Sequence, residues 1–271
     1  MPITPENTWE AVSTIRAQAP LIHNITNYVV MNSTANALLA LGASPVMAHA
    51  REEVEEMVSA ASALVINIGT LSPPWVESMT SAARKAAERR IPIVLDPVGA
   101  GATSYRTRTV RKLLDAVAPT IIRGNASEIL ALAAAEKGRT KGVDATEHSS
   151  RAVEAARRMS ERYGSTICIS GETDFIVSRQ VLLGIKNGHP LMARVTGLGC
   201  TASALCGAFA AVNPSFALAA AQAMAIMGVA GEMAAEISPG PGSLQLHFLD
   251  ILYQLTEEDL VRRMRTSPGA G

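Results

Sequence analysis

The stretch Val195-Thr196-Gly197-Leu198-Gly199-Cys200-Thr201-Ala202 predicts a glycine turn that leads directly into a helix. No charged residue occurs between positions 200 and 231, so no side chain near the helix start neutralises its free backbone N–H groups. A helix N-terminus carries the equivalent of about +0.5 charge and holds phosphate oxygens, and glycines let a ligand approach the backbone closely. The stretch therefore indicates an anion pocket with the Cys200 thiol at its mouth, although it is equally typical of a turn that only starts a buried helix.

Short apolar runs alternate with helical periodicity along the chain, which is typical of parallel strands joined by crossover helices. The runs lack polar alternation, as expected for strands that are buried on both faces. We therefore predict one α/β domain over residues 1–271, with a mostly parallel sheet and an antiparallel hairpin at its edge. The predicted elements are strands at 63–68, 91–95, 119–122 and 165–169, helices at 72–89, 106–117 and 147–162, a surface loop at 136–144, the hairpin at 174–185, and helix after residue 199.

The composition points to a small-molecule partner. Charged residues make up 18% of the 271-residue chain, below the usual share of about 25%, and the formal net charge is zero. No block of Lys and Arg occurs, which argues against nucleic-acid and anionic-membrane binding. The low charge and the 48% apolar content also suggest that some surface is buried between subunits.

The three cysteines, Cys168, Cys200 and Cys206, are too few and too scattered for a disulfide framework or a zinc cluster. The first residues lack the basic and apolar blocks of a secretory signal. Both features predict a reducing, cytoplasmic location. The uncharged stretch at 200–231 is long enough to suggest a membrane span, but Asn213-Pro214 divides it, and we interpret it as two buried helices.

Polar residues follow several of the predicted strands, where ligands bind in open parallel sheets. Asp96 closes one run and precedes the glycines at 99 and 101, so its carboxylate suits a hydrated Mg²⁺ beside a polyphosphate. Glu128 offers a second carboxylate, but Asn125-x-x-Glu128 is also a helix capping arrangement, and the two roles are compatible. Arg123 could neutralise phosphate charge or form an ordinary surface ion pair.

The residues at 21–32 mix amides and apolar groups in a way that suits a small polar heterocycle, or equally a turn before the next helix. His23 has no partner at ligand spacing and is interpreted as a structural histidine. Met47 is a pocket candidate only through its place after Ser44-Pro45-Val46.

Two other nucleotide-binding motifs do not fit. Gly197-x-Gly199-x-x-Ala202 matches the dinucleotide fingerprint, but no acidic residue occurs between Asp174 and Glu232 to hold a ribose. No Walker A motif is present in the sequence. A kinase on this chain must therefore bind phosphates in another way.

Taken together, these motifs resemble the ribokinase superfamily and, within it, the hydroxyethylthiazole kinases. The resemblance covers nearly the whole chain and rests on five segments in the order of that family. They are Asn24-Ile25-Thr26-Asn27, Asn67-Ile68-Gly69-Thr70, Asp96-Pro97-Val98-Gly99-Ala100-Gly101, Arg123-Gly124-Asn125-Ala126-Ser127-Glu128 and Thr196-Gly197-Leu198-Gly199-Cys200.

The resemblance implies a ribokinase-like three-layer α/β/α fold and ATP- and Mg²⁺-dependent phosphorylation of 4-methyl-5-(2-hydroxyethyl)thiazole in thiamine salvage. It also implies a homotrimer with active sites between neighbouring subunits. Carried onto this chain, it implies that Asp96 and Glu128 hold Mg²⁺ through waters, and that Arg123, Ser170, Thr196 and Gly199 contact ATP. The residues that it implies for the thiazole site are Asn27, Val29, Met47, Gly69, Thr70 and Gly197.

Cys200 occupies the position at which most ribokinase relatives carry an aspartate that accepts the proton of the alcohol. This departure argues against strong general-base catalysis and favours a thiol that positions the hydroxyl. Three alternatives stay open on the sequence. The chain could phosphorylate another hydroxymethyl heterocycle such as a pyrimidine, act as a thiol-dependent hydrolase or transferase with a histidine base, or bind nucleotide without catalysis.

Overall fold

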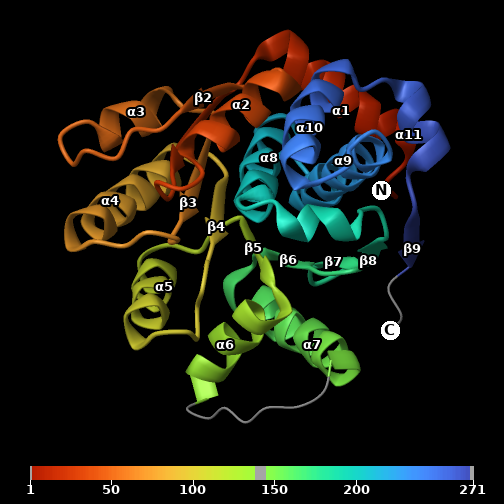
Figure 1. Cartoon of the computed structure of the whole chain (residues 1–271). Helices are drawn as coiled ribbons and strands as arrows, with labels where there is room; N and C mark the ends of the chain where they lie inside the picture. The colour runs from red at the N-terminus through yellow and green to blue at the C-terminus, as the bar shows by residue number, and fades with distance from the viewer. Residues whose placement is uncertain (1, 138–144, 269–271) are drawn as a thin grey trace.

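The centre of the fold is a nine-stranded sheet, seen in a computed structural model that describes residues 2–137 and 145–268 (Figure 1). Its strands are β1 (Leu21–Ile25), β2 (Ser44–Val46), β3 (Ala63–Asn67), β4 (Ile93–Asp96), β5 (Ile121–Asn125), β6 (Thr166–Ser170), β7 (Asp174–Val177), β8 (Leu182–Ile185) and β9 (Thr266–Pro268). They lie in the order β2-β1-β3-β4-β5-β6-β7-β8-β9. The first six are parallel and the last three antiparallel, which confirms the mostly parallel sheet.

One face of the sheet packs on the C-terminal helices, together with two helices from the N-terminal part of the chain (Figure 1). Strand residues that alternate along the parallel strands, such as Ile22, Val65 and Val94, belong to the same buried cluster as these helices. The helices of this cluster are α1 (Pro5–Gln18), α2 (Met31–Leu41), α8 (Leu198–Val212), α9 (Phe216–Glu236), α10 (Pro241–Gln254) and α11 (Glu257–Arg263).

The opposite face carries a second layer of helices (Figure 1). The strand residues that point there, such as Leu64, Ile66 and Leu95, form a separate buried cluster with those helices. Apolar side chains on both faces explain why the runs showed no polar alternation. The helices of this layer are α3 (Val54–Ala60), α4 (Pro73–Arg89), α5 (Ser104–Ala116), α6 (Ala126–Lys137) and α7 (Ala145–Tyr163).

One sequence prediction needs a correction of detail. The β7–β8 hairpin is antiparallel as predicted, but β8 also pairs with β9, so β9 and not the hairpin forms the outer strand of the sheet. The chain after residue 199 is essentially all helix, as predicted, apart from the three-residue strand β9. Strands β1 and β2 were not predicted, since their segments are short and carry polar residues and a proline. The predicted loop at 136–144 lies largely outside the described residues.

The uncharged stretch forms two helices, as predicted. Helix α9 is the one helix among the described residues that is long and apolar enough to cross a membrane, and 78% of its apolar window is buried inside the protein. The neighbouring helix α8 is also largely buried. Both belong to the apolar cluster between the sheet and the outer helices, so burial in the core explains their composition.

Helix α8 lies so close to the sheet that a side chain at Gly207 has no room. A Cβ atom there would lie 2.7 Å from Cγ2 of Val65 and 3.3 Å from Cγ2 of Ile22. We predict that Gly207→Val lowers the free energy of unfolding by about 2 kcal/mol, because overpacking of a filled core costs about 1–3 kcal/mol. Urea denaturation checks this.

The matched control is Gly242→Ala in α10, where an added Cβ meets no atom within 4 Å. That variant should be as stable as the parent or slightly more so, because alanine is a better helix former than glycine. Equal stability of Gly207→Val and the parent protein would contradict the close packing of α8 on the sheet.

Candidate active site

The carboxyl ends of the parallel strands bring four polar residues to one edge of the sheet. Asn67 ends β3 and pairs in register with Asp96 at the end of β4. Asn125 at the end of β5 pairs with Ser170 at the end of β6. The register of the sheet thus brings together the residues at the ends of the strands. In open parallel sheets, ligands bind at this end of the strands.

A chain of hydrogen bonds ties this edge to helix α8. Oδ2 of Asp96 accepts bonds from Nδ2 of Asn67 at 2.8 Å and from Oγ of Ser203 at 2.7 Å. Oδ1 of Asn67 in turn accepts a bond from Nδ2 of Asn27 at 2.9 Å, and the same Nδ2 lies 3.5 Å from Sγ of Cys200. Asp96 and Cys200 therefore belong to one hydrogen-bonded group.

Asp96 is fully buried, and burial raises the pKa of its carboxyl to about 6. Arg123 and the donors Ser203 and Asn67 oppose this shift, while the negative charge of Glu128 adds to it. Burial of a charge without full compensation is costly and is common where a charged ligand completes the site.

Glu128 caps helix α6, as the sequence predicted. Its Oε2 accepts the N–H of Asn125 at 2.8 Å, while Oδ1 of Asn125 accepts the N–H of Glu128 at 2.9 Å. Its Oε1 accepts the N–H of Gly99 at 2.8 Å, which fixes the loop after β4. Both carboxylate oxygens thus accept backbone N–H groups, which fixes the orientation of the Glu128 side chain.

Arg123 is the buried cation of the site and not a surface ion pair. It is only 9% exposed, and its Nε has no hydrogen-bond partner. Burial is the largest single influence and lowers the pKa of Arg123, but the combined effects of Asp96, Cys168, Cys206 and Asp174, of which Asp96 contributes most, leave this pKa raised.

The N-terminus of α8 lies directly over this guanidinium. A Cβ atom at Gly199 would lie 3.0 Å from Nη1 of Arg123, so the glycine permits the close approach. Gly197, which precedes the helix, has a φ of +88°, a conformation that glycine adopts without strain. The structure therefore explains why glycine stands at both 197 and 199. Together the two glycines place the first backbone N–H groups of α8 beside the buried positive charge of Arg123.

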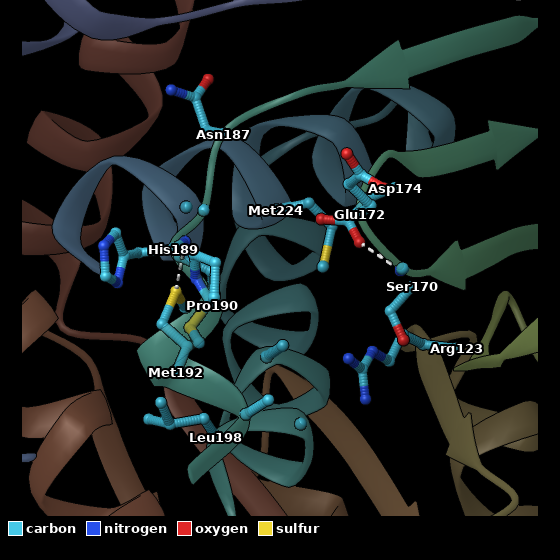
Figure 2. Close-up of a pocket in the computed structure, with 17 residues that line it drawn as sticks. Arg123, Ser170, Glu172, Asp174, Asn187, His189, Pro190, Met192, Leu198 and Met224 are labelled. Atoms are coloured by element: carbon cyan, nitrogen blue, oxygen red, sulfur yellow. Dashed lines mark hydrogen bonds between the residues drawn. The ribbon is translucent and has the colours of Figure 1, made fainter. Parts of the chain in front are cut away.

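A cavity of about 620 Å³ opens next to Arg123 (Figure 2). Arg123, Ser170 and Gly199 lie together at one polar end, and the turn between β6 and β7, the loop after β8, and helices α8 and α9 form the remainder (Figure 2). The apolar part of the lining suits a flat ring, since most ligand pockets combine apolar walls with few polar groups. Its apolar side chains are Pro190, Met192, Ala193, Leu198, Ala202, Met224 and Met227.

Cys200 is half-buried, and burial raises the pKa of its thiol, with a further increase from Asp96. The donors Asn67 and Asn27 oppose that shift. Among the side chains that the structure describes, no histidine bonds to this thiol; His23, for example, bonds to the carbonyl of Ala48 at 2.7 Å. A protonated thiol without a base does not support a thiol-dependent hydrolase or transferase.

The residues expected around a heterocycle are partly brought together. Asn27 lies against Gly69, where an added Cβ would come within 2.5 Å of Nδ2 of Asn27, and Gly197 packs against Val30. Val29 is 69% exposed. Met47 and Thr70 are half-buried, and within the described residues no hydrogen bond joins their side chains to Asn27.

Thr196 lies apart from the large cavity. It lines a separate cavity of about 50 Å³ between α2, α8 and α10, with Asn32, Phe248 and others. Its expected contact with ATP has no support from the position of the side chain and stays a prediction.

Sequence reasoning did not assign a site role to several residues that the structure places here. Ser203 bonds to Asp96 and lies one helical turn after Cys200, so the helical period was the signal that could have found it. Asn67 pairs with Asp96 in the β3–β4 register, and its only signal in the sequence was a polar residue at the end of an apolar run. Glu172, Asp174, Asn187 and His189 line the cavity from the hairpin and the following loop, where no sequence motif marks them.

The fold and the site together define a small-molecule kinase of the ribokinase-like class. The model of the hydroxyethylthiazole kinase family matches residues 12–258, and the chain belongs to that family. It is 76% identical over 269 residues to the hydroxyethylthiazole kinase of Syntrophus aciditrophicus, covering 99% of this chain and 100% of the relative. It is 57% identical to the enzyme of the same name from Leptospira biflexa, over 96% of this chain and 97% of the relative.

The solved structures agree. The structure of a hydroxyethylthiazole kinase protein from Pyrococcus horikoshii is 42% identical and superposes with a TM-score of 0.89, covering 97% of this chain and 98% of that chain. A pyridoxal kinase from Staphylococcus aureus, solved with AMP-PCP and pyridoxal, superposes with a TM-score of 0.60 at 16% identity, over 78% of this chain and 86% of that chain. The second likeness shows the shared fold.

Asp174 at the start of β7 gives a prediction about stability and pH. It is 7% exposed, and burial raises its pKa from 3.8 to about 6, against the opposing effects of the Gly171 N–H and Arg123. The folded protein thus binds a proton at this carboxyl up to about pH 6, whereas the unfolded chain releases it near pH 4. The raised pKa of Asp174 therefore adds to the free energy of unfolding below pH 4, and this contribution is lost as the pH rises to 6.

We predict that Asp174→Asn stabilises the folded protein at pH 7 by up to about 3 kcal/mol, at 1.36 kcal/mol per pKa unit. The gain over the parent should disappear below pH 4, because both side chains are then neutral. Thermal unfolding between pH 3.5 and 8 measures the difference. The control, Glu172→Gln on the exposed neighbour, should leave the pH profile unchanged, and an Asp174→Asn gain that is equal at all pH values would contradict this assignment.

Proposed function

We propose that the chain is a single kinase domain that transfers the γ-phosphoryl group of ATP to the hydroxyl of 4-methyl-5-(2-hydroxyethyl)thiazole. Its membership of the hydroxyethylthiazole kinase family supports this substrate. The observation that carries the proposal is the placement of the α8 N-terminus and Arg123 at the junction between a large cavity and the Asn27–Cys200 group. A phosphoryl group at this junction would lie between a nucleotide and an alcohol.

ATP would fill the 620 Å³ cavity with its phosphates at the polar end. The guanidinium of Arg123, the hydroxyl of Ser170 and the N–H groups that begin α8 at Gly199 are the donors available there. The unpaired Nε of Arg123 supports this placement, because a buried donor without a partner is costly unless a ligand or water satisfies it. The family resemblance implies that Thr196 is a further residue that contacts ATP.

The donor set fits Mg²⁺ bound through waters and phosphates. Asp96 has an ionisable carboxylate whose second oxygen, Oδ1, receives neither the Asn67 nor the Ser203 bond, and Glu128 stands across the site within electrostatic reach of it. Among the described residues, no group of three or more His, Cys, Asp and Glu gathers as a metal cage, as expected for an ion that takes one or two carboxylates and keeps its waters. When bound, Mg²⁺ would neutralise charge on the phosphates.

The thiazole would lie on the other side of the α8 N-terminus, against Asn27, Gly69, Thr70 and Gly197, with Val29 and Met47 covering it. Its hydroxyl would face the thiol of Cys200. Because the thiol keeps its own proton, Cys200 orients the hydroxyl and accepts its proton only weakly. Phosphoryl transfer through a loose transition state depends mainly on alignment and charge neutralisation, and the Arg123 guanidinium and the amides of α8 supply both.

The exposure of the thiazole-side residues supports an assembly in which a neighbouring subunit completes the site, and the family resemblance implies that this assembly is a homotrimer. Tyr28 is 63% exposed and Val29 69% exposed, directly after the buried Asn27. Two apolar side chains next to a polar pocket are expected where another subunit covers them. The zero net charge and the lack of a basic block agree with a cytoplasmic enzyme that acts on small molecules and binds neither nucleic acid nor membrane.

The function is tested by incubating the protein with ATP and a panel of thiazole and pyrimidine alcohols, with and without EDTA. We expect ADP and a phosphorylated product only with the hydroxyethylthiazole and only when Mg²⁺ is present. Phosphorylation of a hydroxymethylpyrimidine alone would assign the chain to the alternative acceptor. ADP release that needs no alcohol would contradict a kinase for either one.

Replacement of the thiol tests the role of Cys200. We predict that Cys200→Ala lowers kcat by less than about 100-fold, below the range of about 10²–10⁴ that an effective general base contributes. The KM for ATP should stay within about twofold, because the thiol lies on the acceptor side. Steady-state kinetics between pH 6 and 9 measure both, and a loss above about 100-fold at unchanged KM values would show that Cys200 is an effective general base.

A further inference from the structure

One wall of the large cavity is a short irregular segment, Asn187-Gly188-His189-Pro190, between β8 and the 3₁₀ helix η1 (Pro190–Arg194). Figure 2 shows this segment running from the end of a strand down to His189, with α9 behind it. Gly188 has a φ of +140°, a conformation that side-chain-bearing residues rarely adopt. A segment of this kind needs external contacts to hold one conformation.

The carboxylate of Glu232 on α9 supplies those contacts. Its Oε1 accepts the backbone N–H of Gly188 at 2.8 Å, and its two oxygens lie 3.2 and 3.3 Å from Nδ2 of Asn187. Arg265 holds the same carboxylate from the other side in an ion pair. The Glu232 side chain is only 11% exposed in that pair, so solvent screens these contacts less than those of a surface ion pair.

Asn187 extends the network to the C-terminal part of the chain. Its Nδ2 donates to the carbonyl of Arg263 at 2.7 Å, and its Oδ1 accepts the N–H of Arg265 at 2.7 Å. The match to the family model ends at residue 258, before both arginines.

Helix α9 also fixes the segment by close backbone packing. A Cβ atom at Gly228 would lie 2.5 Å from Cβ of Asn187 and 2.6 Å from its carbonyl carbon and oxygen. Most of these atoms are backbone, so they cannot move aside without shifting the cavity wall. Gly228 and Glu232 are one helical turn apart on α9, and the segment lies across both.

We propose that Glu232 is a positioning residue for nucleotide binding, which it serves by holding the Asn187–Pro190 wall in its binding conformation; this rests on the proposed use of the cavity for ATP. Glu232 does not line that cavity but a neighbouring groove on the far side of the segment, so it acts through the wall. When only a fraction of molecules holds the binding conformation, the apparent Kd rises by the inverse of that fraction.

Electrostatics and positioning predict opposite results for the same variant. Removal of a negative charge near the cavity would by itself strengthen the binding of an anionic nucleotide. Loss of the contacts that hold the Asn187–Pro190 segment would instead weaken nucleotide binding. The sign of the change in Kd therefore separates a positioning role from a simple charge effect.

The test measures the Kd of Mg²⁺ and AMP-PNP by calorimetry, with no acceptor alcohol present. We expect Glu232→Ala to raise the Kd about tenfold, as it would if about a tenth of the molecules held the wall in place. Glu232→Gln should show a smaller rise, because it keeps an acceptor for the Gly188 N–H. In the kinase assay the KM for ATP should rise with Kd, while kcat and the KM for the thiazole stay within about twofold.

The matched control is Glu236→Ala, one turn further along α9. Glu236 also pairs with an arginine, Arg263, but does not touch the 187–190 segment, and its loss should leave the Kd within about twofold. Gly228→Ala is a second test, since it pushes the wall out while improving helix propensity, and it should also weaken nucleotide binding.

An unchanged or tighter Kd for Glu232→Ala would overturn the proposal, as would a fall in kcat and thermal stability with no change in the KM for ATP. If the parent protein binds nucleotide but phosphorylates no thiazole, the proposed function fails while the Kd comparison still decides the role of Glu232. If the parent binds no nucleotide, both are overturned.

Discussion

A buried positive charge under the start of a helix is the constraint on which the site depends. Arg123 lies beneath Gly199, against Asp96, with Asp174 nearby. Helix N-termini repel cations, and a guanidinium in the protein interior is costly unless it is paired. Two buried carboxylates offset that cost, yet the unpartnered Nε shows that the compensation is incomplete. A phosphate group would complete it, because it pairs with the arginine and the helix start at once.

The surrounding sequence follows from this constraint. Glycine at 199 is needed for the approach of the arginine, and the absence of carboxylates between residues 200 and 231 leaves the positive potential at the helix start available to a ligand. Asp96 has a raised pKa because one arginine and two neutral donors do not fully replace water. The Asn67–Asn27–Cys200 chain then extends the same group toward the acceptor side. The buried charges of the site, Asp96 and Arg123, thus lie together at the carboxyl ends of the parallel strands.

The sequence predicted four of the six parallel strands, the two buried helices α8 and α9 and the polar residues at strand ends, because each depends on local periodicity or on position after an apolar run. The capping role of Glu128 was likewise local. Contacts between distant segments were not predictable. Glu232 meets Asn187 across 45 residues, and β9 joins the sheet by pairing with β8, where Leu183 lies opposite Pro268, a residue 85 positions later in the chain. Thr196 also shows that a place in a motif does not fix which cavity a side chain faces.

The roles of Arg123 and the α8 N-terminus are tested most directly by a crystal structure of the protein with AMP-PNP and Mg²⁺. The account predicts that the γ-phosphate lies within hydrogen-bond distance of the Arg123 guanidinium and of the first N–H groups of α8, with the purine in the methionine-lined part of the cavity. A terminal phosphate placed away from both Arg123 and Gly199 would contradict it.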